Sequence, residues 1–369
     1  MGKDAVKSLQ VSNYQLGVDD QELLELRKEI WGEDHLHNNL EYFKWLYQDN
    51  PLGQGGGVVL RKNGQMVGFA GLCVKKLSVD GKEVSLAHGL DYMISPRARG
   101  GRNAIAVAVE FSKLAKERGF QMGVVYPNLN SLSVLTSKHV QWTPTLEPSL
   151  FVKPLLGVKF DESPFSWAPP FILNLGANVI SLYSNLREAL HSFKKAGEII
   201  EVDSFDERFD RLWGKVCHSE NVQTWRDSSY LNWRYTSHPL YSYVRLACVK
   251  DGEVVGFVIA SKRELLGLDT FLIVDFLILD NSGDVLSSLL QELKSFAVKS
   301  GCRIMGVEAV PGSRSGKIAT DIFVKTGFLM VPSKINPKGF VMTTKDYTNE
   351  NSKATHQENW HFTWGDMDT

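Results

Sequence analysis

The stretch SPRARGGRNA, Ser95–Ala104, decides the fold of this 369-residue sequence because it joins two segments of different pattern. The preceding run AHGLDYMI (87–94) predicts a strand, and the following run AIAVAVEFSKLAKERG (104–119) predicts a helix. The first amides of a helix lack intrahelical acceptors and carry partial positive charge, and three arginines add full charges that suit phosphate. We therefore expect a diphosphate to bind at this turn. The alternative is a solvated turn that is merely basic.

The sequence contains an internal repeat on both sides of this turn. YFKWLYQDNPL (Tyr42–Leu52) matches YLNWRYTSHPL (Tyr230–Leu240) as Y-x-x-W-x-Y-x-x-x-P-L, at an offset of 188 residues (230 minus 42). The same offset brings NGQMVGF (Asn63–Phe69) onto DGEVVGF (Asp251–Phe257) without a gap. Identities in one register indicate an internal duplication. The repeated aromatic residues are interpreted as core packing.

Each half predicts the same order of elements. The Asn-Gly and Asp-Gly pairs predict hairpin turns, and a strand, a helix, another strand and a short helix follow. Gly119 and Gly301 stand where the two long helices would end. We expect an N-terminal domain at 1–155, a proline-rich linker with a helix at 156–196, and a C-terminal domain at 197–369. The last dozen residues predict a strand that buries three aromatic side chains, Trp360, Phe362 and Trp364.

Composition limits the possible functions. The formal net charge is −1, which argues against a broad nucleic-acid surface. The N-terminus MGKDAVKSLQ lacks the apolar core of a secretion signal, and the apolar segment FILNLGANVISLY (171–183) is too short and too interrupted by asparagine to span a bilayer. We therefore expect a cytoplasmic protein without a membrane span. The four cysteines form no CxxC pair, and EDHLH (33–37) has no third ligand nearby, so no metal site is predicted.

The order of elements and the glycine-rich turn resemble the GNAT acyltransferase superfamily, whose acyl-CoA signature is R/Q-x-x-G-x-G/A. The best match is Arg99–Ala104, in which Arg102 replaces the central glycine. The segment YPNLNS (126–131) resembles tandem GNAT proteins often found among bacterial surface-polysaccharide genes. The resemblance implies an α/β fold with two GNAT-like domains in tandem, each a mostly antiparallel mixed sheet flanked by helices.

The resemblance also implies acetyl-CoA as the acyl donor. It places the backbone amide of Met93 or Ile94 at the thioester carbonyl. Asn130 is expected to bond the pantetheine or the acceptor, with a plain asparagine turn as the alternative. The second half reads LDNSGDVLSS (279–288) at the corresponding turn, where Asp284 would repel a diphosphate. We therefore expect the donor only in the first half, with the second half helping to build the acceptor pocket. The expected diphosphate contacts are Arg99, Gly100, Gly101, Arg102, Asn103 and Ala104.

His88 and Asp91 are the candidate catalytic bases for removing the amine proton. They lie three residues apart, so a regular strand would point them to opposite faces unless a bulge intervenes. His88 has alternative roles as a hydrogen-bonding partner of the substrate or as a core histidine. Asp91 has an equivalent, Asp275, in the second half, which equally suits a structural role.

The remaining candidates are acceptor contacts. Tyr126 is a candidate acid for the thiolate, with water as the alternative, because the following helix has no tyrosine. Asn128 is expected to bind pantetheine or acceptor, the alternative being a plain asparagine turn, and Glu308 is expected to face the acceptor. Asp366 and Asp368 are interpreted as a solvated acidic end, with contact to a sugar hydroxyl or amine as the alternative.

The leading functional hypothesis is an acetyl-CoA-dependent N-acetyltransferase. Its acceptor would be a small amine, and the resemblance favours an amino sugar, either free or nucleotide-linked. One alternative is a Fem-type enzyme that moves amino acids from aminoacyl-tRNA onto peptidoglycan precursors, which the balanced charge disfavours. Another is a binding or regulatory protein built on a degraded acyltransferase fold.

Overall fold

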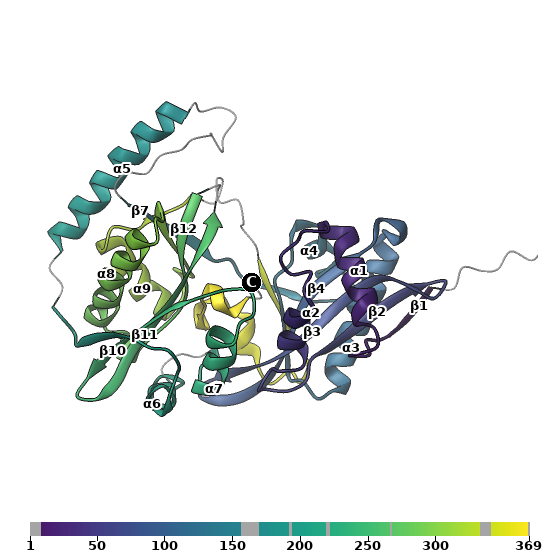
Figure 1. Ribbon diagram of the computed structural model, residues 1–369. Coiled ribbons are helices and arrows are strands. Elements are labelled where there is room, and N and C mark those ends of the chain that lie inside the picture. The colour runs from purple at the N-terminus through teal and green to yellow at the C-terminus, as the bar shows by residue number, and fades with distance from the viewer. Residues whose placement is uncertain are drawn as a thin grey trace, which may run out of the picture. The chain divides into compact units, whose positions relative to one another are not determined.

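The computed structural model describes residues 9–155, 170–191, 194–218, 222–265, 268–332 and 341–367. The chain forms two compact units, drawn in Figure 1. The first unit comprises Met1–Leu146, His238–Leu240 and Phe340–His356. The second unit comprises the remainder: Glu147–Ser237, Tyr241–Gly339 and Gln357–Thr369.

The first unit is built on a mixed sheet with strand order β1-β2-β3-β4-β5-β15-β6. Neighbouring strands are antiparallel except β4 and β5, which are parallel. Helix α3 packs its apolar stripe, including Val107 and Phe111, on one face of the sheet to form the core. The elements are β1 (Leu9–Asn13), α1 (Asp20–Trp31), α2 (Leu40–Tyr47), β2 (Gly56–Lys62), β3 (Gln65–Val79), β4 (Lys82–Ile94), η1 (Pro96–Ala98), α3 (Gly101–Glu117), β5 (Met122–Val125), α4 (Leu129–Leu135), β6 (Thr143–Leu146), β15 (Met342–Asp346) and η5 (Ser352–Thr355).

The second unit repeats this plan with strand order β14-β7-β13-β12-β11-β10-β8. Its one parallel pair on this path is β12 with β13, the counterpart of β4 with β5. Helix α8 packs on this sheet through residues such as Leu289 and Leu293. The elements are β7 (Ser149–Pro154), α5 (Pro170–Leu190), β8 (Glu198–Glu201), α6 (Glu207–Val216), β9 (Val222–Thr224), α7 (Ser228–Leu231), η2 (Asn232–Thr236), β10 (Val244–Lys250), β11 (Glu253–Leu265), β12 (Leu268–Ile278), η3 (Leu279–Asn281), α8 (Gly283–Lys299), β13 (Ile304–Ala309), α9 (Arg314–Lys325), β14 (Leu329–Met330), η6 (Gln357–Asn359), β16 (Trp360–His361) and η7 (Trp364–Asp366).

The two units exchange strands, which the sequence did not indicate. Strand β7 precedes the linker yet pairs with β13 in the second sheet, and β15 from the end of the chain pairs with β5 in the first sheet. The expected boundaries at residues 155 and 197 therefore do not coincide with the compact units. Strand periodicity specifies which face of a strand is buried, but it does not specify which of two similar sheets receives it.

The predicted turns are confirmed by the backbone. Asn63 and Gly64, and likewise Asp251 and Gly252, have positive φ at both positions, as the tight hairpin turn of twisted strands requires. Gly119 and Gly301 take the left-handed conformation immediately after the C-cap residues of α3 and α8. Their amides bond back to carbonyls of the last helical turn, which closes each helix.

The linker and the C-terminus differ from expectation in extent. Residues 156–169 of the expected linker lie outside the described residues, and the helix that follows spans Pro170–Leu190. Trp360, Phe362 and Trp364 are buried as expected, but only Trp360–His361 form a strand before a 3-10 turn begins. Among the helices of the described part of the chain, none is both long and apolar enough to cross a bilayer.

Candidate active site

A β-bulge in β4 sets the geometry of the candidate site. Phe69 of β3 faces Met93 and Gly71 faces Leu90, so Ala70 stands opposite two residues, Asp91 and Tyr92. Asp91 has φ near +51°, a left-handed conformation that aspartate tolerates better than most residues. The extra residue bends the strand and shifts the alternation of the side chains by one position, so residues three apart across the bulge share a face.

The bulge brings His88 and Asp91 to one face of the sheet. His88 stands opposite Cys73, whose sulfur accepts a hydrogen bond from Asn50 Nδ2 at 3.4 Å just after α2. Asp91 accepts a hydrogen bond from Tyr47 of α2 at 3.1 Å. Both side chains therefore lie on the α2 side, opposite α3. The bulge that the sequence analysis named as the exception is present, so the opposite faces of a regular strand do not apply to His88 and Asp91.

Beyond the bulge, β4 separates from β5. Their parallel pairing runs from Leu86 with Met122 to Gly89 with Val125, while β4 continues to Ile94. The Ser95 amide donates to Val67 of β3, and successive amides of a strand alternate sides. The Ile94 amide therefore points away from β3, toward the side that β5 has left. Of the two expected amides, Ile94 is thus better placed than Met93 to bond a ligand.

The start of α3 is open. A Cβ at Gly100 or Gly101 would meet nothing within 4 Å, and the Gly100 backbone is extended. Asn103 Nδ2 donates to the Ala98 carbonyl at 2.7 Å, which braces the turn. Tyr92 of β4 donates to the Ala104 carbonyl at 2.7 Å and ties the first helical turn to the bulged strand.

The arginines around this turn differ in what they contact. Arg97 is held by Glu29 of α1 in an ion pair of 2.7 Å, so its charge is already compensated. Arg99 and Arg102 are exposed, and neither forms an ion pair within the described part of the chain. The positive charge left for a ligand therefore comes from Arg99, Arg102 and the first amides of α3.

The start of α8 is closed by comparison. A Cβ at Gly283 would come within 2.7 Å of Ile322 of α9. Ser282 is the N-cap, and Asp284 is the second residue of the helix, within its first turn. A small pocket does lie here, bounded by Phe276, Ile318 and Ile322 among other mainly apolar residues. The residues described as lining this pocket include no arginine, and the first turn of α8 carries the carboxylate of Asp284.

His88 is buried, with 1% of its surface exposed. Its ring packs edge-to-face on the ring of Tyr126, with centroids 5.4 Å apart, where the chain leaves β5. Tyr126 is half-buried. The structure therefore brings these two candidates together at the point where β4 and β5 separate.

Asp91 lies in a buried polar cluster of the first unit. It pairs with Arg27 of α1, which has no exposed surface, and accepts from Tyr47. Burial, followed by the charge of Asp91, raises the pKa of Tyr47 well above its usual value. Tyr47 therefore remains protonated and serves as the donor in this contact.

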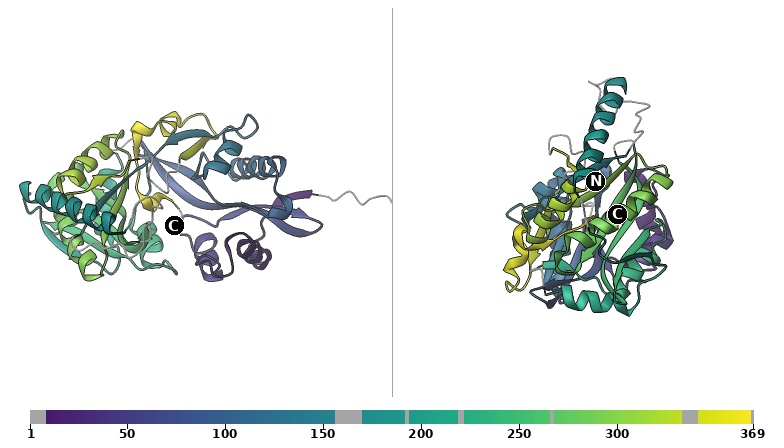
Figure 2. Two further views of the ribbon diagram at one scale, coloured as in Figure 1. Left: turned by 90° about the horizontal axis from the view of Figure 1, so that it is seen from above. Right: turned by 90° about the vertical axis from the view of Figure 1, so that its left-hand side faces the viewer.

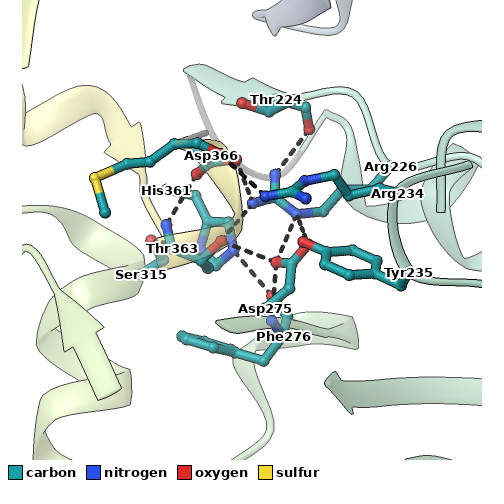
Figure 3. Close-up of polar contacts among 11 residues, drawn as sticks. Thr224, Arg226, Arg234, Tyr235, Asp275, Phe276, Ser315, His361, Thr363 and Asp366 are labelled. Carbon is teal, nitrogen blue, oxygen red and sulfur yellow. Dashed lines mark hydrogen bonds and ion pairs between the residues drawn. The ribbon is translucent and has the colours of Figure 1, made fainter. Parts of the chain in front are cut away.

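The second unit holds an equivalent cluster around Asp275, shown in Figure 3. Asp275 pairs with Arg226 at 2.9 Å and accepts from Tyr235 at 2.8 Å. Arg226 also reaches Asp366 at 2.8 Å, which is buried, so the expectation of a solvated Asp366 is wrong. Asp368 lies outside the described residues. His361 contacts the Phe276 carbonyl at 3.1 Å, and burial followed by Arg226 lowers its pKa to about 4.

The internal repeat already paired the tyrosine and the aspartate of these clusters, but this correspondence was not interpreted as a contact. Tyr47 and Tyr235 occupy the same position of the repeated Y-x-x-W-x-Y motif, and Asp91 and Asp275 also correspond. The motif was interpreted as core packing, but its last tyrosine bonds the repeated aspartate in both units. The arginines gave no such signal, because Arg27 comes from α1 and Arg226 from the segment between β9 and α7.

The remaining candidates are more dispersed. Asn128 caps α4 by accepting from the amides of Asn130 and Ser131 at 3.0 Å, and Asn130 is exposed in the first turn. Glu308 lies on β13 of the second unit and is 1% exposed. It is therefore not part of the unit that holds the other candidates.

Neither a protein-family model nor a curated protein sequence matches this chain. Solved structures do match in fold. A GCN5-related N-acetyltransferase from Anabaena variabilis aligns with a TM-score of 0.62 at 11% identity, covering 95% of this chain and 75% of that one. N-myristoyltransferase of Saccharomyces cerevisiae with bound myristoyl-CoA aligns with a TM-score of 0.57 at 12% identity, covering 92% and 80%.

A tandem GNAT protein from the clavulanic acid biosynthesis pathway also aligns, with a TM-score of 0.56 at 11% identity. The match covers 92% of this chain and 99% of that one, so both repeats are included. Identities this low carry information about fold alone. Together with the bulged, splayed strand and the repeated sheet, they show that this chain has the GNAT fold in tandem.

Proposed function

We propose that this protein is an acyl-CoA-dependent N-acyltransferase whose first unit binds the donor. The observation that carries the proposal is the open start of α3, where Gly100 and Gly101 leave the first amides accessible beside Arg99 and Arg102. The diphosphate of coenzyme A fits this combination of amides and guanidinium groups. The similarity in fold to acyltransferases supports the same assignment.

The reaction would follow from the opening between β4 and β5. The Ile94 amide would donate to the thioester carbonyl or to the pantetheine, whose arm would lie along the unpaired side of β4. The acceptor amine, having lost a proton, forms the new C–N bond as the C–S bond breaks. The departing thiolate then takes a proton, for which Tyr126 at the exit of β5 is the nearest candidate to His88.

His88 is proposed as the base because it is the candidate that the second unit lacks. The strand pairing that places His88 opposite Val124 places Leu272 opposite Gly306 in the second unit. Asp91, by contrast, is paired with Arg27 and has an equivalent in Asp275, which favours a structural role. As a base, His88→Gln should lower kcat and remove the acidic limb of the pH–rate profile. A fall in melting temperature with an unchanged pH profile would instead make it a core histidine.

The proposed acyl group is acetyl, and the proposed acceptor is an amino sugar, free or nucleotide-linked, in surface-polysaccharide synthesis. This part rests on the resemblance of YPNLNS to tandem GNAT proteins of polysaccharide gene clusters. Asn128, Asn130 and Glu308 remain proposed acceptor or pantetheine contacts.

Calorimetry with acetyl-CoA tests the donor site, and release of free thiol in the presence of amino sugars and their nucleotide forms tests the reaction. We expect saturable donor binding and thiol release with at least one amine. Absence of donor binding would refute the proposal. Donor binding without turnover on any amine would favour the non-catalytic alternative, and activity requiring aminoacyl-tRNA would favour the Fem-type alternative.

A further inference from the structure

Helix α5 of the second unit exposes most of its large apolar side chains to solvent and turns two serines toward the sheet on which it packs. Ser181 and Ser184 face inward with no exposed surface, and Ser184 Oγ donates to the Gly327 carbonyl at 2.7 Å. Leu175, Leu182 and Leu186 face outward with 68%, 58% and 56% of their surfaces exposed. Figure 2 shows α5, in teal, on the outer side of this unit. Two serines therefore lie beside Ala177 on the covered side of the helix, while its leucines face outward, against the usual pattern of an amphipathic helix.

Polar contacts hold the helix in this orientation. Glu188 of α5 pairs with Lys153 at 2.9 Å and with Lys294 of α8 at 2.7 Å. Lys153, which is itself buried, also donates to the Thr326 carbonyl at 2.7 Å. A helix rotated to bury its leucines would lose these ion pairs and leave Lys153 uncompensated, which is costly. The apolar face is therefore fixed outward by the fold.

The spacing of the exposed residues fits another helix. Leu175, Val179, Leu182, Leu186 and Ala189 follow one another at intervals of 4, 3, 4 and 3 residues, and all are exposed. A 3–4 repeat with apolar side chains forms a straight seam along one side of a helix, which is the pattern of helices that pair through knobs-into-holes contacts.

We propose that a second copy of this chain covers this seam, so that two α5 helices pair in a symmetric dimer. The large side chains of the seam and the adjoining Tyr183 and Leu190 are 52–81% exposed, which amounts to on the order of several hundred Å² of apolar surface, a large share of the roughly 800 Å² per partner of a standard protein interface. A twofold axis would match each seam with its own copy, so no other partner is required.

An anionic membrane surface fits this helix less well. Helices that lie in a membrane interface are rich in lysine and arginine on their polar face. Helix α5 carries one arginine, Arg187, and one glutamate, Glu188, so it has no net charge to offer anionic lipid. Arg187 bonds Tyr183 at 3.2 Å, and Glu188 is engaged with the two lysines.

Sedimentation velocity of the full chain across micromolar concentrations tests the proposal. We expect a dimer for the wild type and a dimer weakened at least tenfold for Leu182→Lys, with unchanged circular dichroism and melting temperature. The matched control is Val298→Lys on α8, where an exposed valine outside the seam is replaced and the dimer should remain. In addition, Leu182→Cys should form a disulfide-linked dimer under mild oxidation, because the four native cysteines are buried.

Two results would overturn the proposal. One is a wild-type monomer, particularly if it floats with vesicles of anionic phospholipid and Leu182→Lys does not, because the occupant would then be a membrane. The other is a dimer that survives Leu182→Lys and gives no cross-link through Leu182→Cys, because the interface would then lie elsewhere. Neither result depends on acyltransferase activity, so the test stands apart from the proposed function.

Discussion

The starts of α3 and α8 follow equivalent strands in the two units, and they differ in access, charge and neighbours. Gly100 and Gly101 have free space around them and exposed arginines beside them, whereas Gly283 lies against Ile322 and precedes Asp284. The polar clusters around Asp91 and Asp275, by contrast, keep the same tyrosine contact in both units. After a duplication, the features that both copies keep support the shared fold, and the features that only one copy keeps indicate its particular function.

The largest effect expected is on stability, from the cluster that the two units share. Asp275→Ala leaves a buried arginine short of one partner and should lower the free energy of unfolding by about 3–5 kcal/mol. Chemical denaturation measures this loss. Asp91→Ala should act in the same direction, since Asp91 also pairs with a buried arginine. If the Asp91→Ala protein were stable but inactive, the two aspartates would not share a structural role, and Asp91 would be the catalytic base.

The second largest effect is the pH dependence of stability that His361 of the second unit causes. His361 has a folded pKa of about 4, against about 6.5 when unfolded, so the unfolded chain binds more protons between these values. Stability should therefore fall as pH drops from 6.5 toward 4, by on the order of 3 kcal/mol at most.

The matched control for this pH effect is His361→Gln. Burial also raises the pKa of Asp275, which acts in the opposite direction, so the difference between wild type and His361→Gln isolates the histidine. Urea unfolding at several pH values measures it. Equal pH slopes for the two proteins would contradict the prediction.

The third effect separates the two helix starts. Gly100→Asp places a carboxylate where the diphosphate is proposed to bind, and should weaken acetyl-CoA binding by about 100-fold or more through repulsion. The extended Gly100 backbone and the open space around it leave the fold intact. Gly100→Ala is the control and should lose far less affinity. Unchanged calorimetry for Gly100→Asp would place the donor elsewhere.

The smallest effect is expected from the second unit's carboxylate. Asp284→Ala should leave acetyl-CoA affinity unchanged, because α8 begins in a closed apolar environment. It should cost about 0.3–1 kcal/mol of stability, since an acidic side chain is lost from a first helical turn. A large change in donor affinity by calorimetry would show that the second unit binds the donor.

The sequence by itself determined the duplication, the hairpin turns, the order of strands and helices within each half, and the helix ends at Gly119 and Gly301. These features depend on local patterns, since side-chain periodicity and the backbone freedom of glycine act over a few residues. The same local reasoning singled out Arg99–Ala104, which the structure places at the start of α3, and the contrasting Asp284 at the start of α8.

Only the tertiary structure decided which sheet receives β7 and β15, which arginines accompany the two aspartates, and which face of α5 is covered. The bulge at Asp91 brought His88 and Asp91 to one side, and Arg27 and Arg226 reached equivalent aspartates from different elements. These outcomes depend on contacts between residues far apart in the chain, where several partners are sterically possible and the total packing energy selects among them. A pattern read along the sequence has no means of ranking those partners.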